Sequence, residues 1–111
     1  MNNDEIEYEI IDGNGKYKDY SYLYGYLEFD GNLVNGEING YGKKYYSNGH
    51  LNFEGMYLNG IKNGFGKEYY SNGNLKFEGI YKDNMEWDGN GFNTNGEFVY
   101  EIKDGQGEIK Q

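Results

Sequence analysis

Residues 51–60 of the chain read LNFEGMYLNG, and this stretch decides the fold. Its first five positions follow a Leu-x-Phe-acidic-Gly pattern that begins at residues 27, 51 and 75, a spacing of 24 residues. The sequence Asn-Gly-aromatic-Gly at 39–42 returns at 63–66, and Tyr-Tyr-Ser-Asn-Gly at 45–49 returns at 69–73. A fixed period of this length indicates a stack of similar small units.

Within one unit, the residue pattern alternates with a period of two. Leu51, Phe53, Gly55 and Tyr57 fall on one face of an extended strand, and the residues between them fall on the other. A second strand is predicted over 64–70, because aromatic residues favour a half-buried pleated surface. The Asn-Gly pairs at 59–60 and 72–73 tolerate the positive φ that tight turns require. Each unit is therefore predicted to be a β-hairpin.

The predicted fold class is all-β: a single-layer, elongated antiparallel ribbon of consecutive hairpins, about 40–50 Å long. We expect no long helix. Residues 1–111 are assigned to one repeat domain with units at about 6–25, 26–50, 51–74, 75–97 and 98–110. The first and last units are degenerate, as the ends of a repeat array usually are. The unit at 75–97 is irregular: Trp87 falls beside an apparent one-residue insertion before Gly89-Asn90-Gly91, and Asn95-Gly96 then closes the unit two residues early relative to that element.

Composition limits the partners that the chain can bind. Its 111 residues carry 10 basic and 19 acidic side chains, a formal net charge of −9. Such a charge repels phosphate backbones and anionic lipids, so neither nucleic-acid binding nor direct binding to anionic membranes is expected. It favours a basic protein partner or self-association. The chain has no cysteine, no cofactor is expected, and we expect a cytoplasmic location.

The repeated Glu-Gly, Asn-Gly and Gly-x-Gly elements, at 54–55, 59–60 and 64–66, resemble the MORN repeat. The resemblance covers roughly residues 26–107. The additional Leu-x-Phe-Glu-Gly and Tyr-Tyr-Ser-Asn-Gly pieces are similar to a microbial variant seen in YwqK-type, antitoxin-like repeat proteins. The resemblance implies a curved or twisted ribbon that acts as a scaffold, dimerisation module or docking surface, without enzymatic activity. The alternative function is an antitoxin or immunity protein that neutralises a basic toxin.

The repeated aromatic residues are the best candidates for a binding surface. One set must form the core, and the other is either core as well or an exposed groove for a partner segment. Glu54 and Glu78 recur on one face, where we expect them to bond turn amides or to form an acidic stripe. Their repetition argues against a glycosidase pair, which is unique in its protein. The candidate partner-binding residues are Tyr45, Tyr46, Tyr57, Tyr69, Tyr70, Tyr81, Trp87, Glu54 and Glu78.

The remaining motifs favour structural roles. No helix follows any Gly-x-Gly, so these glycines are expected to receive aromatic rings, with Phe53 or Tyr57 over Gly66, rather than phosphate. His50 lacks a second His or Cys and is expected to be a solvated turn residue. The acidic run at 83–90 lacks calcium-loop spacing. Trp87 either caps the array or marks a binding hot spot.

Overall fold

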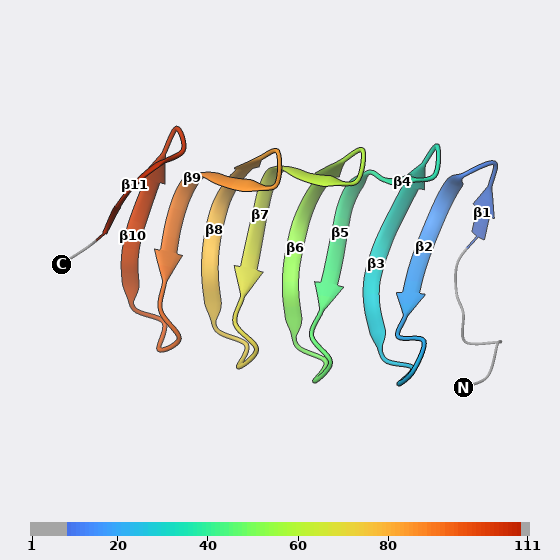
Figure 1. Ribbon diagram of the computed structural model, residues 1–111, viewed down its shortest axis with the longest axis horizontal. Coiled ribbons are helices and arrows are strands. Elements are labelled where there is room, and N and C mark those ends of the chain that lie inside the picture. Colours follow the sequence, from blue (N-terminus) through green and yellow to red (C-terminus); the bar gives the residue numbers. More distant parts are fainter. Residues whose placement is uncertain (1–8, 110–111) are drawn as a thin grey trace.

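The computed structural model describes residues 9–109 and shows one open, antiparallel sheet of consecutive hairpins (Figure 1). The sheet order is β1-β2-β3-β5-β6-β7-β8-β9-β10-β11, and the short β4 pairs only with β3. The molecule is 51 Å in its longest dimension and 16 Å in its shortest. The described residues contain no helix, and so none that could cross a membrane. The predicted fold class is confirmed.

Most strands are six to nine residues long. Every pair of neighbours in the sheet is antiparallel. The strands are β1 (Glu9–Ile11), β2 (Asn14–Tyr20), β3 (Leu27–Val34), β4 (Glu37–Ile38), β5 (Gly40–Tyr45), β6 (Leu51–Leu58), β7 (Ile61–Tyr69), β8 (Leu75–Lys82), β9 (Met85–Phe92), β10 (Phe98–Lys103) and β11 (Gln106–Ile109).

The turns at the upper edge of the ribbon in Figure 1 share one backbone conformation. In the β6–β7 turn, Asn59 has φ 52° and Gly60 has φ 87°, and the four corresponding pairs have the same signs. Two successive positive φ values define the tight hairpin turn whose twist matches that of the strands. Each upper turn after the first also bonds to the previous unit: the Gly60 amide donates to the Ile38 carbonyl at 2.8 Å, and the Asn84 amide donates to the Lys62 carbonyl at 2.9 Å.

The lower turns are tied to one another by side chains. The Tyr46 hydroxyl donates to the Tyr69 carbonyl at 2.7 Å, and the Asn48 amide side chain donates to Ser71 at 2.9 Å. One unit on, Tyr70 and Asn72 make the same two bonds, to Phe92 and Thr94. The Tyr-Tyr-Ser-Asn-Gly sequence therefore holds each hairpin to the next one.

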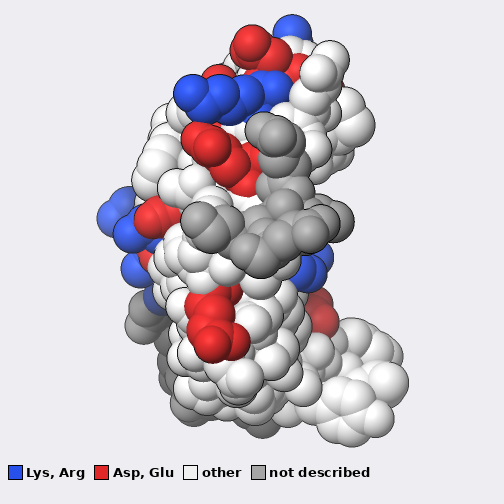
Figure 2. All heavy atoms as spheres, turned by 90° about the vertical axis from the view of Figure 1, so that its left-hand side faces the viewer, with Lys and Arg blue, Asp and Glu red and all other residues white. Residues whose placement is uncertain are grey.

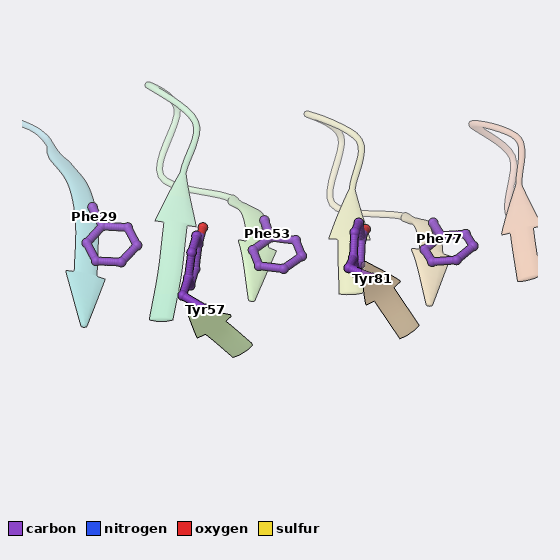
Figure 3. Close-up of a cluster of buried hydrophobic side chains, with 5 residues drawn as sticks. All are labelled: Phe29, Phe53, Tyr57, Phe77 and Tyr81. Atoms are coloured by element: carbon purple, nitrogen blue, oxygen red, sulfur yellow. The ribbon is translucent and has the colours of Figure 1, made fainter. Parts of the chain in front are cut away.

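The core is a single file of aromatic rings on one face of the sheet (Figure 3). Phe53 and Phe77 have no exposed surface, and Tyr81 is 2% exposed. Successive rings meet edge to face, with centroids 5.6 Å apart for Phe53–Tyr57 and 5.2 Å for Phe53–Tyr81. Edge-to-face contact places the positive ring edge on a negative ring face. The buried rings are Phe29, Phe53, Tyr57, Phe77 and Tyr81.

Glycines provide the space into which these rings fit. A Cβ added to Gly66 would lie 2.7 Å from the Phe53 ring and 3.1 Å from Tyr81. The expected aromatic ring over Gly66 is therefore confirmed, and of the two candidates it is Phe53. Tyr57 leans toward the preceding unit and covers Gly42, at 3.1 Å.

The hairpin of the unit at 75–97 has one residue fewer between its paired strand glycines than the hairpin before it, so the one-residue insertion expected beside Trp87 was wrong. Gly55 pairs with Gly66 between β6 and β7, whereas Gly79 pairs with Gly89 between β8 and β9, one residue closer along the chain. Gly89 thus occupies the place of the second glycine in Gly-x-Gly, beneath the Phe77 ring. The apparent insertion arose from aligning glycine with glycine, when ring packing sets the register.

Candidate interaction surfaces

The larger candidate site is an open groove of about 540 Å³ at the N-terminal end of the ribbon. It includes Phe29 and Tyr57, the core rings nearest that end. Aromatic side chains line most of it, and Lys44 is the cation among its lining residues. Asp19 and Glu28 place two carboxylates on its rim. The lining residues are Tyr17, Asp19, Tyr26, Glu28, Phe29, Ile38, Lys44, Tyr45, Tyr46, Ser47 and Tyr57.

This groove lies where the contacts between successive core rings are looser than in the middle of the ribbon. Farther along the ribbon, Phe53 is enclosed by Tyr57 on one side and Tyr81 on the other, in edge-to-face contacts. Phe29 has Tyr57 on one side but only Tyr17, at 6.3 Å and 40°, on the other. The looser contact leaves Phe29 8% exposed, where Phe53 is fully covered. The groove therefore lies where the repeated packing is incomplete.

A second feature lies on the opposite face of the sheet, around Glu54. Its carboxylate accepts hydrogen bonds from the hydroxyls of Tyr41 and Tyr69, the latter at 2.6 Å. These bonds, Tyr41 first, lower the pKa of Glu54. The bond to the carboxylate raises the pKa of Tyr41 to about 12, and burial and then the Glu54 bond raise that of Tyr69. Glu54 therefore bonds tyrosine hydroxyls, not the turn amides that were expected.

This opposite face carries a row of charges of alternating sign. Cross-strand pairing runs from Lys18 to Asp30 and then to Lys43, Glu54, Lys67 and Glu78, one residue on each of six neighbouring strands. The row continues through Asn90 to Glu101. We call these eight residues the charge row. Figure 2 looks onto the C-terminal end of the ribbon instead of this face, and basic and acidic side chains lie beside one another there as well. The excess of acidic residues therefore does not make this face uniformly negative.

A row of exposed apolar side chains runs beside the charge row. On each of four strands, its member lies two residues from the member of the charge row. Tyr41 pairs with Met56, and Phe65 pairs with Ile80, so four neighbouring strands contribute one residue each. Their exposed fractions are 49%, 40%, 51% and 41%. A hollow of about 340 Å³ joins the two rows, with Tyr41, Met56 and Phe65 beside Glu54 and Lys67. We call Tyr41, Met56, Phe65 and Ile80 the apolar row.

The structure divides the predicted partner-binding residues among different places. Tyr45, Tyr46 and Tyr57 line the groove, although Tyr57 is also a core ring. Tyr81 is a core ring whose hydroxyl donates to Glu68 at 2.8 Å, so its place in an exposed surface was wrong. The Tyr70 hydroxyl is used in the bond between lower turns. Tyr69, Glu54 and Glu78 belong to the opposite face and do not line the groove.

Trp87 is half-buried and closes the C-terminal end of the upper edge. Its ring covers Gly105, where an added Cβ would lie 2.7 Å from the indole. Its carbonyl accepts the Gly105 amide at 2.9 Å, and Lys82 Nζ lies 4.5 Å from its ring centroid. These contacts fasten the last hairpin, β10–β11, to the array. The structure thus gives Trp87 the packing of a cap.

Several residues of these surfaces were not among those predicted from the sequence. Tyr17 and Asp19 belong to the degenerate first unit, which offers no repeat to align, and Tyr26 and Glu28 lie at the start of the second unit, where the later units have other residues. The residues of the apolar row repeat with the period of 24 residues. They had been placed on the face opposite the core but not considered as a binding surface. His50 is exposed in a lower turn, as expected. Among the described residues, no three His, Asp or Glu side chains gather as a metal site.

Comparison with known proteins agrees with this architecture. The family model described as MORN repeat matches residues 29–51 and 53–75. The two matched segments cover consecutive units, from the Phe29 ring to the start of β8. No curated protein matches the chain.

Proposed function

We propose that this chain, a MORN repeat protein, is a non-enzymatic interaction module that holds a segment of a partner protein in its N-terminal groove. MORN repeats are commonly protein- or membrane-interaction modules and are generally non-catalytic. The observation that carries the proposal is the groove itself. It combines an open volume of about 540 Å³ with aromatic walls and two rim carboxylates.

The chemistry of the groove selects the kind of segment that fits. Tyrosine rings provide apolar walls with polar tips, and they contact a peptide with little loss of side-chain entropy. A lysine or arginine of the segment can place its methylenes on the rings and its charge between Asp19 and Glu28. The hydroxyl of Tyr26 already donates to Glu28 at 3.3 Å and holds that carboxylate at the rim. The preferred ligand is therefore an extended segment with a basic residue beside an apolar one.

Peptide display against the full chain tests this proposal. Selected peptides are expected to be rich in arginine or lysine next to an aromatic or aliphatic residue. Asp19→Lys, an exposed rim position, is expected to weaken binding of the selected peptides by about tenfold or more, since it replaces attraction by repulsion. Glu97→Lys, an exposed position in a lower turn, is the matched control and is expected to leave binding unchanged. The proposal would be refuted if no peptide were enriched, or if the enriched peptides bound the Asp19→Lys variant as tightly as the wild-type chain.

A basic toxin is one partner with this chemistry, which keeps the antitoxin or immunity role as a second candidate. Support for it is limited to the net charge of −9 and the carboxylates at the groove rim. It predicts that co-expression with a toxic gene product from the same cell restores growth, and that Asp19→Lys abolishes the rescue. A rescue that survives Asp19→Lys would place toxin binding elsewhere on the molecule.

A further inference from the structure

The face opposite the core is complementary to itself, and we propose that two copies of the chain associate back to back through the charge row and the apolar row. The groove lies beside the core rings on the other face, so this surface is independent of the one proposed above. The association depends on the order in which the sheet presents its charges. It requires no residue of the groove.

When the strand order is reversed, each of the six alternating charges in the charge row is replaced by a charge of opposite sign. Six successive members alternate as Lys18, Asp30, Lys43, Glu54, Lys67 and Glu78, each the cross-strand partner of the next. A two-fold axis parallel to the strands reverses strand order in the second copy. Opposite charges then face each other whenever the axis passes between two strands, and like charges face each other when it passes through a strand. An axis along the ribbon would instead place every charge opposite its own equivalent in the second copy.

The apolar row selects one of the allowed positions for the axis. With the axis between β6 and β7, Met56 lies opposite Phe65 of the second copy, and Tyr41 lies opposite Ile80. All four members of the row then contact apolar residues. Shifting the axis by one strand spacing toward β5 would place Phe65 opposite Asn32. The axis between β6 and β7 also lies midway between the ends of the ten-strand path, so the two ribbons overlap along their whole length.

The same position completes the pairing of charges. Glu54 faces Lys67 of the second copy, and Lys43 faces Glu78, and the symmetry makes each pair twice. Asp30 falls opposite the neutral Asn90, so no like charges meet in that part of the row. The hollow lined by Tyr41, Met56 and Phe65 lies across the axis and is available to the facing side chains. The arrangement thus satisfies the six alternating charges of the charge row and the apolar row together.

The size of the contact predicts a reversible dimer. Two rows about 7 Å apart, on strands about 4.8 Å apart from β2 to β10, give on the order of 500 Å² for each copy. Stable interfaces of ordinary size bury about 800 Å² for each partner. The predicted association is therefore weaker than that of an obligate dimer, with a Kd in the micromolar range.

Sedimentation velocity of the full chain across a concentration series provides the test. The chain is expected to be monomeric at low concentration and to become a dimer as the concentration rises to about 0.5 mM. Lys43→Glu and Glu78→Lys are each expected to weaken self-association by about tenfold or more, because each creates two like-charge contacts. Glu37→Lys makes the same charge change as Glu78→Lys at an exposed position in β4, off both rows, and is expected to leave self-association unchanged. Phe65→Glu is expected to abolish the dimer.

Mixing the two charge variants gives the decisive measurement. In a mixed pair, the Lys43→Glu copy faces the Glu78→Lys copy, so both contacts between positions 43 and 78 again join opposite charges. Equimolar mixing is therefore expected to restore dimers that neither variant forms alone. A wild-type chain that stays monomeric at about 0.5 mM, single variants that still dimerise, or a mixture that does not recover would each overturn the proposal. Circular dichroism confirms folding, and Lys43→Gln replaces any charge reversal that does not fold.

Discussion

Replacing one strand glycine with alanine tests whether the core depends on aromatic rings that pack directly against the backbone of glycine residues. Gly66→Ala places a methyl group 2.7 Å from two carbons of the Phe53 ring and 3.1 Å from Tyr81. Ordinary contact begins near 3.4 Å, so the Phe53 edge must retreat by about 0.7 Å or more. Phe53 has no exposed surface and is held on both sides by other rings, so it has no free space to move into.

The expected loss in the free energy of unfolding is about 2 kcal/mol, within the range for overpacking a close-packed core. For a domain of this size, that loss lowers Tm by about 8 °C. Urea unfolding followed by circular dichroism measures the change. Gly107→Ala is the matched control, since its added methyl would lie 3.1 Å from a side-chain carbon of Ile102 at the edge of the sheet, where the neighbour can move. The control is expected to change stability by less than about 0.5 kcal/mol.

A double variant separates ring displacement from other effects. Phe53→Leu shortens the side chain over Gly66 and by itself costs about 1–2 kcal/mol in lost burial. If the clash is the cause, the double variant Gly66→Ala, Phe53→Leu loses less stability than the two single changes summed, with a coupling of about 1 kcal/mol. Additive losses, or a Gly66→Ala variant as stable as Gly107→Ala, would refute the reasoning.

The remaining predictions concern polar contacts and the ends of the array. Glu54→Gln is expected to lose about 1 kcal/mol of stability because two tyrosine hydroxyls lose a charged acceptor, whereas Glu78→Gln should be close to neutral in thermal melts. The lowered pKa of Glu54 means that its contribution is present at neutral pH and is lost as pH falls below about 4.3 and through the folded-state pKa, so the two melts should converge in acid. Tyr70→Phe removes the bond to the next lower turn and is expected to cost about 1 kcal/mol, with faster amide exchange confined to the β8–β10 region. Trp87→Ala uncovers Gly105 and is expected to expose the β10–β11 hairpin to proteolysis before the rest of the ribbon.

The repeat itself could be predicted closely because its determinants are local. Asn59 and Gly60 specify a turn by their tolerance of positive φ, and alternation specifies which side chains share a face. Phe53 over Gly66 followed from the need to explain a glycine inside a strand. These inferences depend only on residues within a single hairpin.

The errors arose where neighbouring units contact one another. Alternation assigns Tyr57 to the core face but does not say whether it leans forward or back along the ribbon, so its contact with Gly42 was not foreseen. In the unit at 75–97, matching Gly89 to the first glycine of the pattern gave an insertion, whereas ring packing leaves one residue fewer between the paired strand glycines. The groove was missed because it arises from a loose contact between Tyr17 and Phe29, which no repeated pattern encodes.

The packing of rings on glycine also explains where this fold can carry specificity. On the core face, Phe53, Tyr57 and their equivalents fill space left by glycine and by each other, so each unit constrains the next. On the opposite face, side chains such as Met56 and Phe65 contact solvent and can change with little effect on the hairpins. Because the strands are held by the core face and the turns, the opposite face can hold its alternating charges in a fixed order at strand spacing. That fixed order is what a second ribbon of the same sequence can recognise.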